Sequence, residues 1–347
     1  MKLPFSNALS DVASAVQRVL GGLAPPLPDL SEALPTPSRP LVKPVPVAKP
    51  VMRGPRGGRI EEHIFTGPAG ARPYKLYIPS GYRGQPVPLI VMLHGCTQSP
   101  DDFAVGTRMN QAAEAETCLV AWPRQVKTAN LHKCWNWFRE GDQQRGSGEP
   151  SVITGIVHQV MREYAVDKRR VYVAGLSAGG AAAAVLGETY PDLFAAVGVH
   201  SGLPCGAAHD ASSAFVAMKT GSDGVIRRAG SGLPPTIVFH GDRDGTVNPR
   251  NGDSVVAQAI SGQHLRAEST QGMVPDGHAW RRTRYRDADG MVKVEQWVIH
   301  GGGHAWSGGS ADGSFTDPQG PDATAAMMRF FLAHPLAHPS AHPSARQ

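Results

Sequence analysis

The sequence predicts an α/β protein in which a doubly wound, mostly parallel sheet is flanked by helices within a single domain. Short apolar runs that indicate buried strands alternate with segments of helical periodicity between residues 88 and 333. The chain has 347 residues, 41% of them hydrophobic, which is enough to bury a sizeable core. Parallel strands must be joined by crossover connections, and the helical segments supply them.

Residue type and periodicity indicate where the strands and helices of this domain lie. Strands are expected where apolar and β-branched residues run together, as in "PLIVMLHG" and "RRVYVAG". Helices are expected where apolar residues recur every three or four positions, and the helix from residue 181 should end near Pro191. The expected strands are 88–95, 118–123, 169–175, 194–202, 234–244 and 294–304, and the expected helices are 101–116, 150–166, 181–191, 254–261 and 321–333.

Both ends of the chain differ in composition from this domain, which we place at residues 58–333. Residues 1–22 have the spacing of a short amphipathic helix. Residues 23–57 are proline-rich, with ten prolines between positions 24 and 55, and are expected to form a disordered tether. Residues 334–347 continue the Ala-His-Pro repeat and are expected to be a low-complexity tail.

Charge and hydropathy exclude several classes of protein. The formal net charge is only +5, and no dense run of lysine and arginine occurs in the domain, so we expect no nucleic-acid partner. No segment is long and apolar enough for a transmembrane helix. Polar residues interrupt the apolar stretch of the first twenty positions, which argues against a signal peptide and favours a cytoplasmic over a secreted protein.

The four cysteines give no metal-binding spacing. Cys96, Cys118, Cys134 and Cys205 include no C-x-x-C pair, and no histidine lies at zinc-ligand spacing from them. We therefore expect no metal. Two disulfides, one bridge that braces a functional site, and four buried thiols are all compatible with the sequence.

Ser177 is the expected nucleophile. It lies in "AGLSAGG", a G-x-S-x-G motif between an apolar strand and an alanine-rich helix. This strand–turn–helix context is that of a nucleophile elbow, in which a strained turn lifts the serine hydroxyl above the sheet. A plain tight turn between strand and helix is the alternative.

A nucleophilic serine needs a histidine base and an acid that orients it, and in the hydrolase fold the chain order is serine, acid, histidine. In "HGDRDGTVNP" the acid is expected to be Asp244, with Asp242 as the competitor. In "IHGGGHAW" the base is expected to be His304, which follows three glycines, with His300 as the competitor. Each candidate lies just after a predicted strand.

A carbonyl that is attacked by the serine becomes an oxyanion, and backbone N–H donors must stabilise it. One donor should be the N–H of Ala178, directly after the nucleophile. The second should be the N–H of Cys96, in the loop after strand 88–95.

Six motifs in one order resemble the esterase family of polyhydroxybutyrate (PHB) depolymerases: "LHGCTQ", "CWNWF", "AGLSAGG", "YPDLFAAVGVHSGLPCG", "HGDRDGTVNP" and "GGGHAW". The resemblance spans about residues 60–333, and the oxyanion loop precedes Ser177, as in the arrangement called catalytic domain type 1. It implies an α/β-hydrolase fold, a Ser177–Asp244–His304 triad and no metal or organic cofactor. Unlike the polymer-degrading members of the family, this chain is expected to have no secretion signal and no polymer-binding domain after Leu332.

The resemblance further makes Trp135 a candidate wall of the substrate cleft, with Trp306 beside His304 as the next candidate and core packing as the alternative. A Cys96–Cys134 bridge would hold the loop that contains "CWNWF" against the end of strand 88–95, where the expected oxyanion donor Cys96 lies. We expect a serine esterase that hydrolyses hydroxybutyrate polymer or oligomers through an acyl-enzyme, or else a feruloyl or acetyl-xylan type of carbohydrate esterase. A binding protein that docks on a polymer granule through its N-terminal arm is the alternative from another class.

Overall fold

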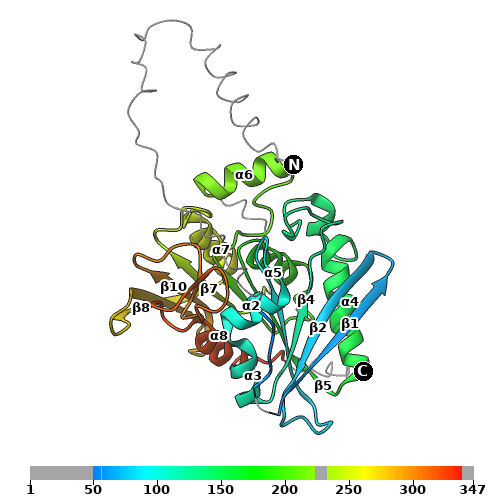
Figure 1. Cartoon of the computed structure of the whole chain (residues 1–347). Helices are drawn as coiled ribbons and strands as arrows, with labels where there is room; N and C mark the ends of the chain where they lie inside the picture. The colour runs from blue at the N-terminus through cyan, green and yellow to red at the C-terminus, as the bar shows by residue number, and fades with distance from the viewer. Residues whose placement is uncertain (1–49, 56, 223–232, 338–347) are drawn as a thin grey trace, which may run out of the picture. The chain divides into compact units, whose positions relative to one another are not determined.

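A ten-stranded sheet runs through the computed structural model, which describes residues 50–55, 57–222 and 233–337 (Figure 1). Its strand order is β1-β2-β4-β3-β5-β6-β7-β10-β9-β8. The inner strands, from β4 to β10 in this order, all pair in parallel, as the sequence predicts. They are β3 (Val87–Leu93), β4 (Leu119–Pro123), β5 (Val166–Leu176), β6 (Ala196–His200), β7 (Thr236–Gly241) and β10 (Val292–Ile299).

An antiparallel hairpin extends the sheet at each edge, and neither hairpin was expected. One consists of β1 (Arg59–Gly67) and β2 (Gly70–Ile78), which joins β4. The other consists of β8 (Arg266–Met273) and β9 (Ala279–Arg286), which joins β10. Strands β1, β8 and β9 are only partly buried and carry charged residues, so they lack the continuous apolar runs of the inner strands. Strand β2 is more deeply buried, but Arg72 and Lys75 interrupt its apolar residues.

Helices cover both faces of the sheet and create two large apolar cores. On one face lie α4 (Gly148–Glu163), α5 (Ala178–Thr189) and α7 (Arg250–Ile260). On the other face lie α2 (Pro100–Thr107), α3 (Met109–Glu116) and α8 (Ala323–Leu332). Within β5 the side chains alternate between the faces, since Val173 belongs to the first core and Tyr172 to the second. The remaining elements are η1 (Glu140–Gln143), α6 (Ala211–Thr220), β11 (Trp306–Ser307) and β12 (Thr316–Asp317).

The helix expected over residues 101–116 is two helices. Arg108 separates α2 from α3 and has a left-handed backbone, with φ of 55° and ψ of 24°. Its N–H donates to the Ala104 carbonyl and so ends α2. Its guanidinium donates to the Gly308 carbonyl, a contact 200 residues away that periodicity along the sequence cannot reveal.

The packed body is wider than the predicted bounds of 58 and 333. Met52 is 5% exposed and belongs to the second core, and its N–H donates to Asp101 Oδ1 at 2.9 Å. At the other end, Leu336 packs against the same core and its N–H donates to the Arg169 carbonyl at 2.8 Å. The expected helix over 1–22, the tether up to residue 49 and the tail from 338 lie outside the described residues. None of the helices in the described ranges has the length and apolar character needed to span a bilayer.

Candidate active site

Ser177 occupies a sharp turn between β5 and α5, as the elbow motif predicts. Its φ of 58° and ψ of −121° are strained for a residue with a side chain. The turn is held on both sides, because the Ser177 N–H donates to the His200 carbonyl and the Ser177 carbonyl accepts from the Ala181 N–H, each at 2.9 Å. The strand end therefore presents the serine at the carboxyl edge of the sheet, where sites of this fold class lie.

The glycines of the motif permit an approach that no other residue allows. A Cβ on Gly179 would lie 2.0 Å from the Leu93 carbonyl oxygen, and a Cβ on Gly175 would lie 2.3 Å from the Gly179 carbonyl carbon. Both clashes are with backbone atoms, which cannot move aside as a flexible side chain could. Helix α5 can therefore start directly against β3 and β5 only because these two positions are glycine.

The structure pairs His304 with Asp244. His304 Nδ1 lies 2.8 Å from Asp244 Oδ2, and the Asp244 side chain is fully buried. The other carboxylate oxygen, Oδ1, accepts from the N–H groups of Thr246 and Val247 at 2.9 Å each. Since a carboxylate only accepts, Nδ1 of His304 carries the proton and Nε2 is left as the acceptor that a general base requires.

A second imidazole also faces Asp244, and sequence reasoning did not single it out. His240 Nε2 lies 3.3 Å from Asp244 Oδ2 and 2.9 Å from the Val247 carbonyl oxygen. Burial by itself would raise the pKa of Asp244, but hydrogen bonds from His240, His304 and the Val247 N–H outweigh it and hold that pKa well below its usual range. The signal in the sequence was the histidine that ends the strand in "VFHGDRDG".

The competing residues form a separate pair nearer the surface. His300 Nδ1 lies 2.9 Å from Asp242 Oδ2, and the Gly301 N–H donates to Asp242 Oδ1 at 2.7 Å. The Asp242 and His300 side chains are 39% and 46% exposed, whereas that of His304 is 11% exposed. Asp242 thus pairs with an exposed histidine, whereas Asp244 is contacted by two histidines that are mostly buried, His304 and His240.

The loop after β3 holds the Gly95–Cys96 peptide in one orientation. His94 Nε2 accepts from the Gln125 N–H at 3.1 Å, so Nδ1 carries the proton and donates to the Gly95 carbonyl at 2.7 Å. The C=O and N–H of a trans peptide point in opposite directions, and the Cys96 N–H is therefore turned away from the His94 ring. A Cβ on Gly95 would lie 3.6 Å from Ser177 Cβ, which places this loop beside the elbow.

Further contacts fix the same loop from both sides. The Trp135 indole donates to the His94 carbonyl at 3.0 Å, and the Gly95 N–H donates to Gln98 Oε1 at 2.9 Å. A disulfide joins Cys96 to Cys134, with their Cα atoms 4.2 Å apart. The one-bridge alternative is therefore the one observed, and the other two cysteines, Cys118 and Cys205, are buried thiols.

The expectation that Trp135 and Trp306 line the substrate cleft is wrong, because both side chains are fully buried. Trp135 belongs to the first core and holds the oxyanion loop from behind. Trp306 belongs to the second core, stacks on His200 with ring centroids 5.1 Å apart, and donates to Thr324 Oγ1 at 3.0 Å. Core packing, the alternative for Trp135, describes both residues.

A third, smaller apolar cluster lies around the elbow. It brings together residues from the oxyanion loop, the elbow helix and the loop after Asp244, which are far apart in the sequence: Trp137, Ala178, Ala181, Leu203 and Val247, with Cys96, Cys134 and Phe138 packed against them. The expected N–H donors, Cys96 and Ala178, thus lie in one cluster. Among the described residues no three histidine, cysteine or carboxylate side chains gather as metal ligands do.

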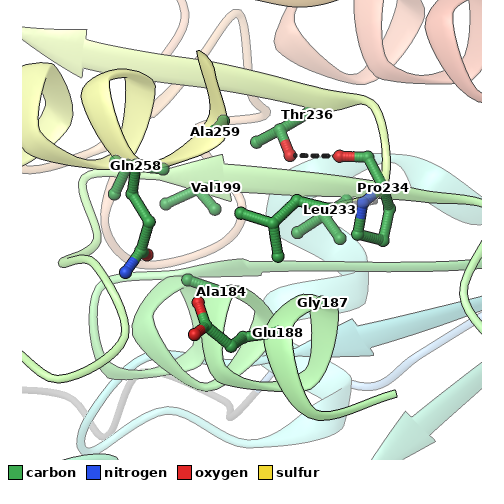
Figure 2. A pocket seen from close by; sticks show the side chains of 11 residues that line it. Ala184, Gly187, Glu188, Val199, Leu233, Pro234, Thr236, Gln258 and Ala259 are labelled. Carbon is green, nitrogen blue, oxygen red and sulfur yellow. Dashed lines mark hydrogen bonds between the residues drawn. The ribbon is translucent and has the colours of Figure 1, made fainter. Parts of the chain in front are cut away.

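The narrow cavity drawn in Figure 2 lies away from this site. Its lining comes from the second half of α5, the C-terminal half of α7, and strands β6 and β7, with Thr236 at the amino end of β7. Ser177 instead follows the carboxyl end of β5. None of the expected site residues lines the cavity, so it does not serve as the substrate site.

Comparisons with known proteins agree with the motifs. A family model described as "Esterase PHB depolymerase" matches residues 72–273. Poly(3-hydroxyalkanoate) depolymerase C of Paucimonas lemoignei is 33% identical over 250 residues, which are 69% of this chain and 59% of that protein. Poly(3-hydroxybutyrate) depolymerase of Ralstonia pickettii is 29% identical over 251 residues, which are 67% of this chain and 50% of that protein. The chain thus spans 59% and 50% of the lengths of these two depolymerases.

Among solved structures, an acetyl xylan esterase from Aspergillus awamori superposes with a TM-score of 0.62 at 19% identity. The match covers 79% of this chain and 99% of that one, and it shows a common fold. The elbow, the parallel sheet, and a family model that matches more than half of the sequence lead to one conclusion: the chain has the α/β-hydrolase fold and belongs to the PHB depolymerase family of esterases.

Proposed function

We propose that this protein is a serine esterase that hydrolyses carboxylic esters through an acyl-enzyme on Ser177. The observation that carries the proposal is the Asp244–His304 pair, which leaves His304 Nε2 as an acceptor, together with the strained elbow that holds Ser177. Family membership supports the same chemistry.

In the first half-reaction, His304 Nε2 removes the proton of the Ser177 hydroxyl while Oγ attacks the ester carbonyl carbon. The carbonyl oxygen becomes an oxyanion and accepts hydrogen bonds from the N–H groups of Cys96 and Ala178. As the tetrahedral intermediate collapses, His304 gives its proton to the departing alkoxide, and the alcohol leaves. The acyl group remains on Ser177 as an ester.

In the second half-reaction, water takes the place of the alcohol, and His304 removes a proton from it as it attacks the acyl carbon. The intermediate collapses, the proton returns to Ser177 Oγ, and the carboxylic acid leaves. Asp244 stays ionised throughout, which agrees with its depressed pKa, and stabilises the imidazolium that His304 becomes.

The substrate class that the relatives favour is a polyester or oligomer of hydroxyalkanoic acids, since both depolymerases are named for such polymers. An acetyl-xylan type of carbohydrate ester is the second candidate, because the solved esterase of that name is matched over 99% of its length. Docking of the N-terminal arm on a polymer granule remains a prediction, since that arm lies outside the described residues.

The test is to measure hydrolysis of hydroxybutyrate oligomers, acetylated xylan and feruloyl sugars by the wild type and by Ser177→Ala. We expect the variant to fold normally, because it loses one hydroxyl and no core volume, and to lose turnover of every ester. A serine-directed phosphonate should label only Ser177 of the wild type. Labelling at another serine, or undiminished turnover in the variant, would contradict the proposed nucleophile.

A further inference from the structure

Phe315 has two features that oppose stability. Its φ is 53°, in the left-handed region that bulky side chains rarely adopt. Its side chain is also poorly buried, because the residue is 47% exposed. A phenylalanine that neither relaxes its backbone nor fills a core gives the fold little, and strained residues of this kind gather at functional sites.

The position of Phe315 relative to the catalytic base is specific. Its ring meets the His304 ring edge to face, with centroids 6.4 Å apart and planes at 79°. The Phe315 carbonyl accepts from the Trp306 N–H at 2.7 Å, two residues after His304. The exposed aromatic ring is therefore tied to the same backbone segment that carries the histidine.

A second set of contacts fixes Phe315 from its other side. The Ser314 N–H donates to Asp102 Oδ1 at 2.9 Å, and the Ser314 carbonyl accepts from Gln98 Nε2 at 3.0 Å. Gln98 Oε1 at the same time accepts from the Gly95 N–H of the oxyanion loop. One glutamine side chain thus joins the backbone next to Phe315 to the loop of Cys96, the expected oxyanion donor that precedes Ser177.

We propose that Phe315 contacts the alcohol part of the ester and so determines specificity on the leaving-group side. This rests on the proposed function, in which His304 delivers its proton to the departing alkoxide and the alcohol must lie next to His304. An apolar ring beside that position would pack against carbon atoms of a long or aromatic alcohol, but not against a methyl group. In a polyester, this part of the substrate is the neighbouring hydroxyacyl unit.

The experiment separates the two halves of the ester. One series keeps butyrate as the acyl group and changes the alcohol from methanol to 2-phenylethanol, and the other keeps ethanol and changes the acyl group from acetate to hexanoate. Phe315→Ala should lower kcat/KM for 2-phenylethyl butyrate by about 5- to 30-fold, the range of a lost aromatic contact, and that for methyl butyrate by less than about twofold. Its effect on the acyl series should not change with chain length.

Two further variants test the cause. Phe315→Gly removes the same ring and relieves the left-handed backbone, so it should lose the same selectivity while its melting temperature stays equal or rises. Phe215→Ala is the matched control, because Phe215 is 63% exposed on α6 and has no place in the proposal. It should leave both ester series unchanged.

The assignment of Phe315 would be overturned if the kcat/KM of Phe315→Ala fell with the length of the acyl chain, or fell equally on every ester. It would also be overturned if kcat/KM showed no selective fall on esters of large alcohols. Equal loss would mean that the ring only supports His304. Failure of the proposed function itself looks different, since wild type and Ser177→Ala would then hydrolyse methyl butyrate equally.

Discussion

Lowering the pH from 7 to 5 should destabilise the folded chain through two buried histidines, His94 and His200. Burial lowers the pKa of His94 to about 4 and that of His200 to about 3. Both rings use Nε2 as an acceptor: His94 accepts from the Gln125 N–H, and His200 accepts from the Ser307 N–H at 3.0 Å. Protonation would place an N–H against an N–H in each case.

The sign and size of the effect follow from these pKa values. The unfolded chain, with a histidine pKa near 6.5, binds more protons than the folded chain at every pH between the two values. The free energy of unfolding therefore falls as the pH drops through 6.5, and by pH 5 each histidine should have removed about 2 kcal/mol, or about 4 kcal/mol together. That is a large share of the roughly 5–15 kcal/mol by which folded domains are stable.

Urea unfolding at pH 7, 6 and 5 measures this loss, and His200→Phe assigns it. Phenylalanine can keep the stacking on Phe239 and Trp306 but cannot be protonated. Below pH 6 the slope of unfolding free energy against pH should be about 1.4 kcal/mol per pH unit smaller in the variant than in the wild type. Burial raises the pKa of Glu149 and so opposes the trend, but the two proteins share this group. Equal slopes in the two proteins would show that protonation of His200 does not destabilise the fold.

Three further outcomes are expected. Asp244→Asn should reduce kcat by about 10⁴-fold in an ester assay and Asp242→Asn far less; the reverse order would assign the acid to the surface pair. Trp135→Phe should lower the melting temperature and reduce activity on small and bulky esters alike, because it removes the hydrogen-bond donor to the His94 carbonyl. A loss of activity confined to bulky esters would instead mean that the indole contacts the substrate. Cys134→Ser opens a loop of 38 residues, so the unfolding free energy should fall by up to about 4 kcal/mol, and an unchanged urea midpoint would show that the bridge contributes nothing.

The inner part of the fold follows from the sequence because its physical causes are local. Continuous apolar runs predict the inner parallel strands, and the glycines around Ser177 predict the elbow. The edge hairpins escape such reasoning, since strands such as "AWRRTRYR" are partly exposed and their pattern depends on which neighbours they meet.

The site residues that were misjudged or missed depend on contacts between distant segments. A tryptophan next to a cysteine says nothing about burial, and only the fold shows Trp135 behind the oxyanion loop. His240 lies four residues before Asp244, yet its contact with that carboxylate needs the turn to be folded. Phe315 is distinguished by its backbone angle, which no residue pattern encodes.

The lack of space at Gly179 identifies a part of the protein in which substitutions should not be tolerated, in contrast to the loops around it. A single added carbon there would collide with the Leu93 carbonyl, so a library covering β3, β5 and the start of α5 should yield few active clones. The loop that carries Phe315 is held through hydrogen bonds of Ser314 and Phe315 that other residues can supply. New substrate range in this enzyme family should therefore come from exchanging loops between members while the elbow is transplanted unchanged.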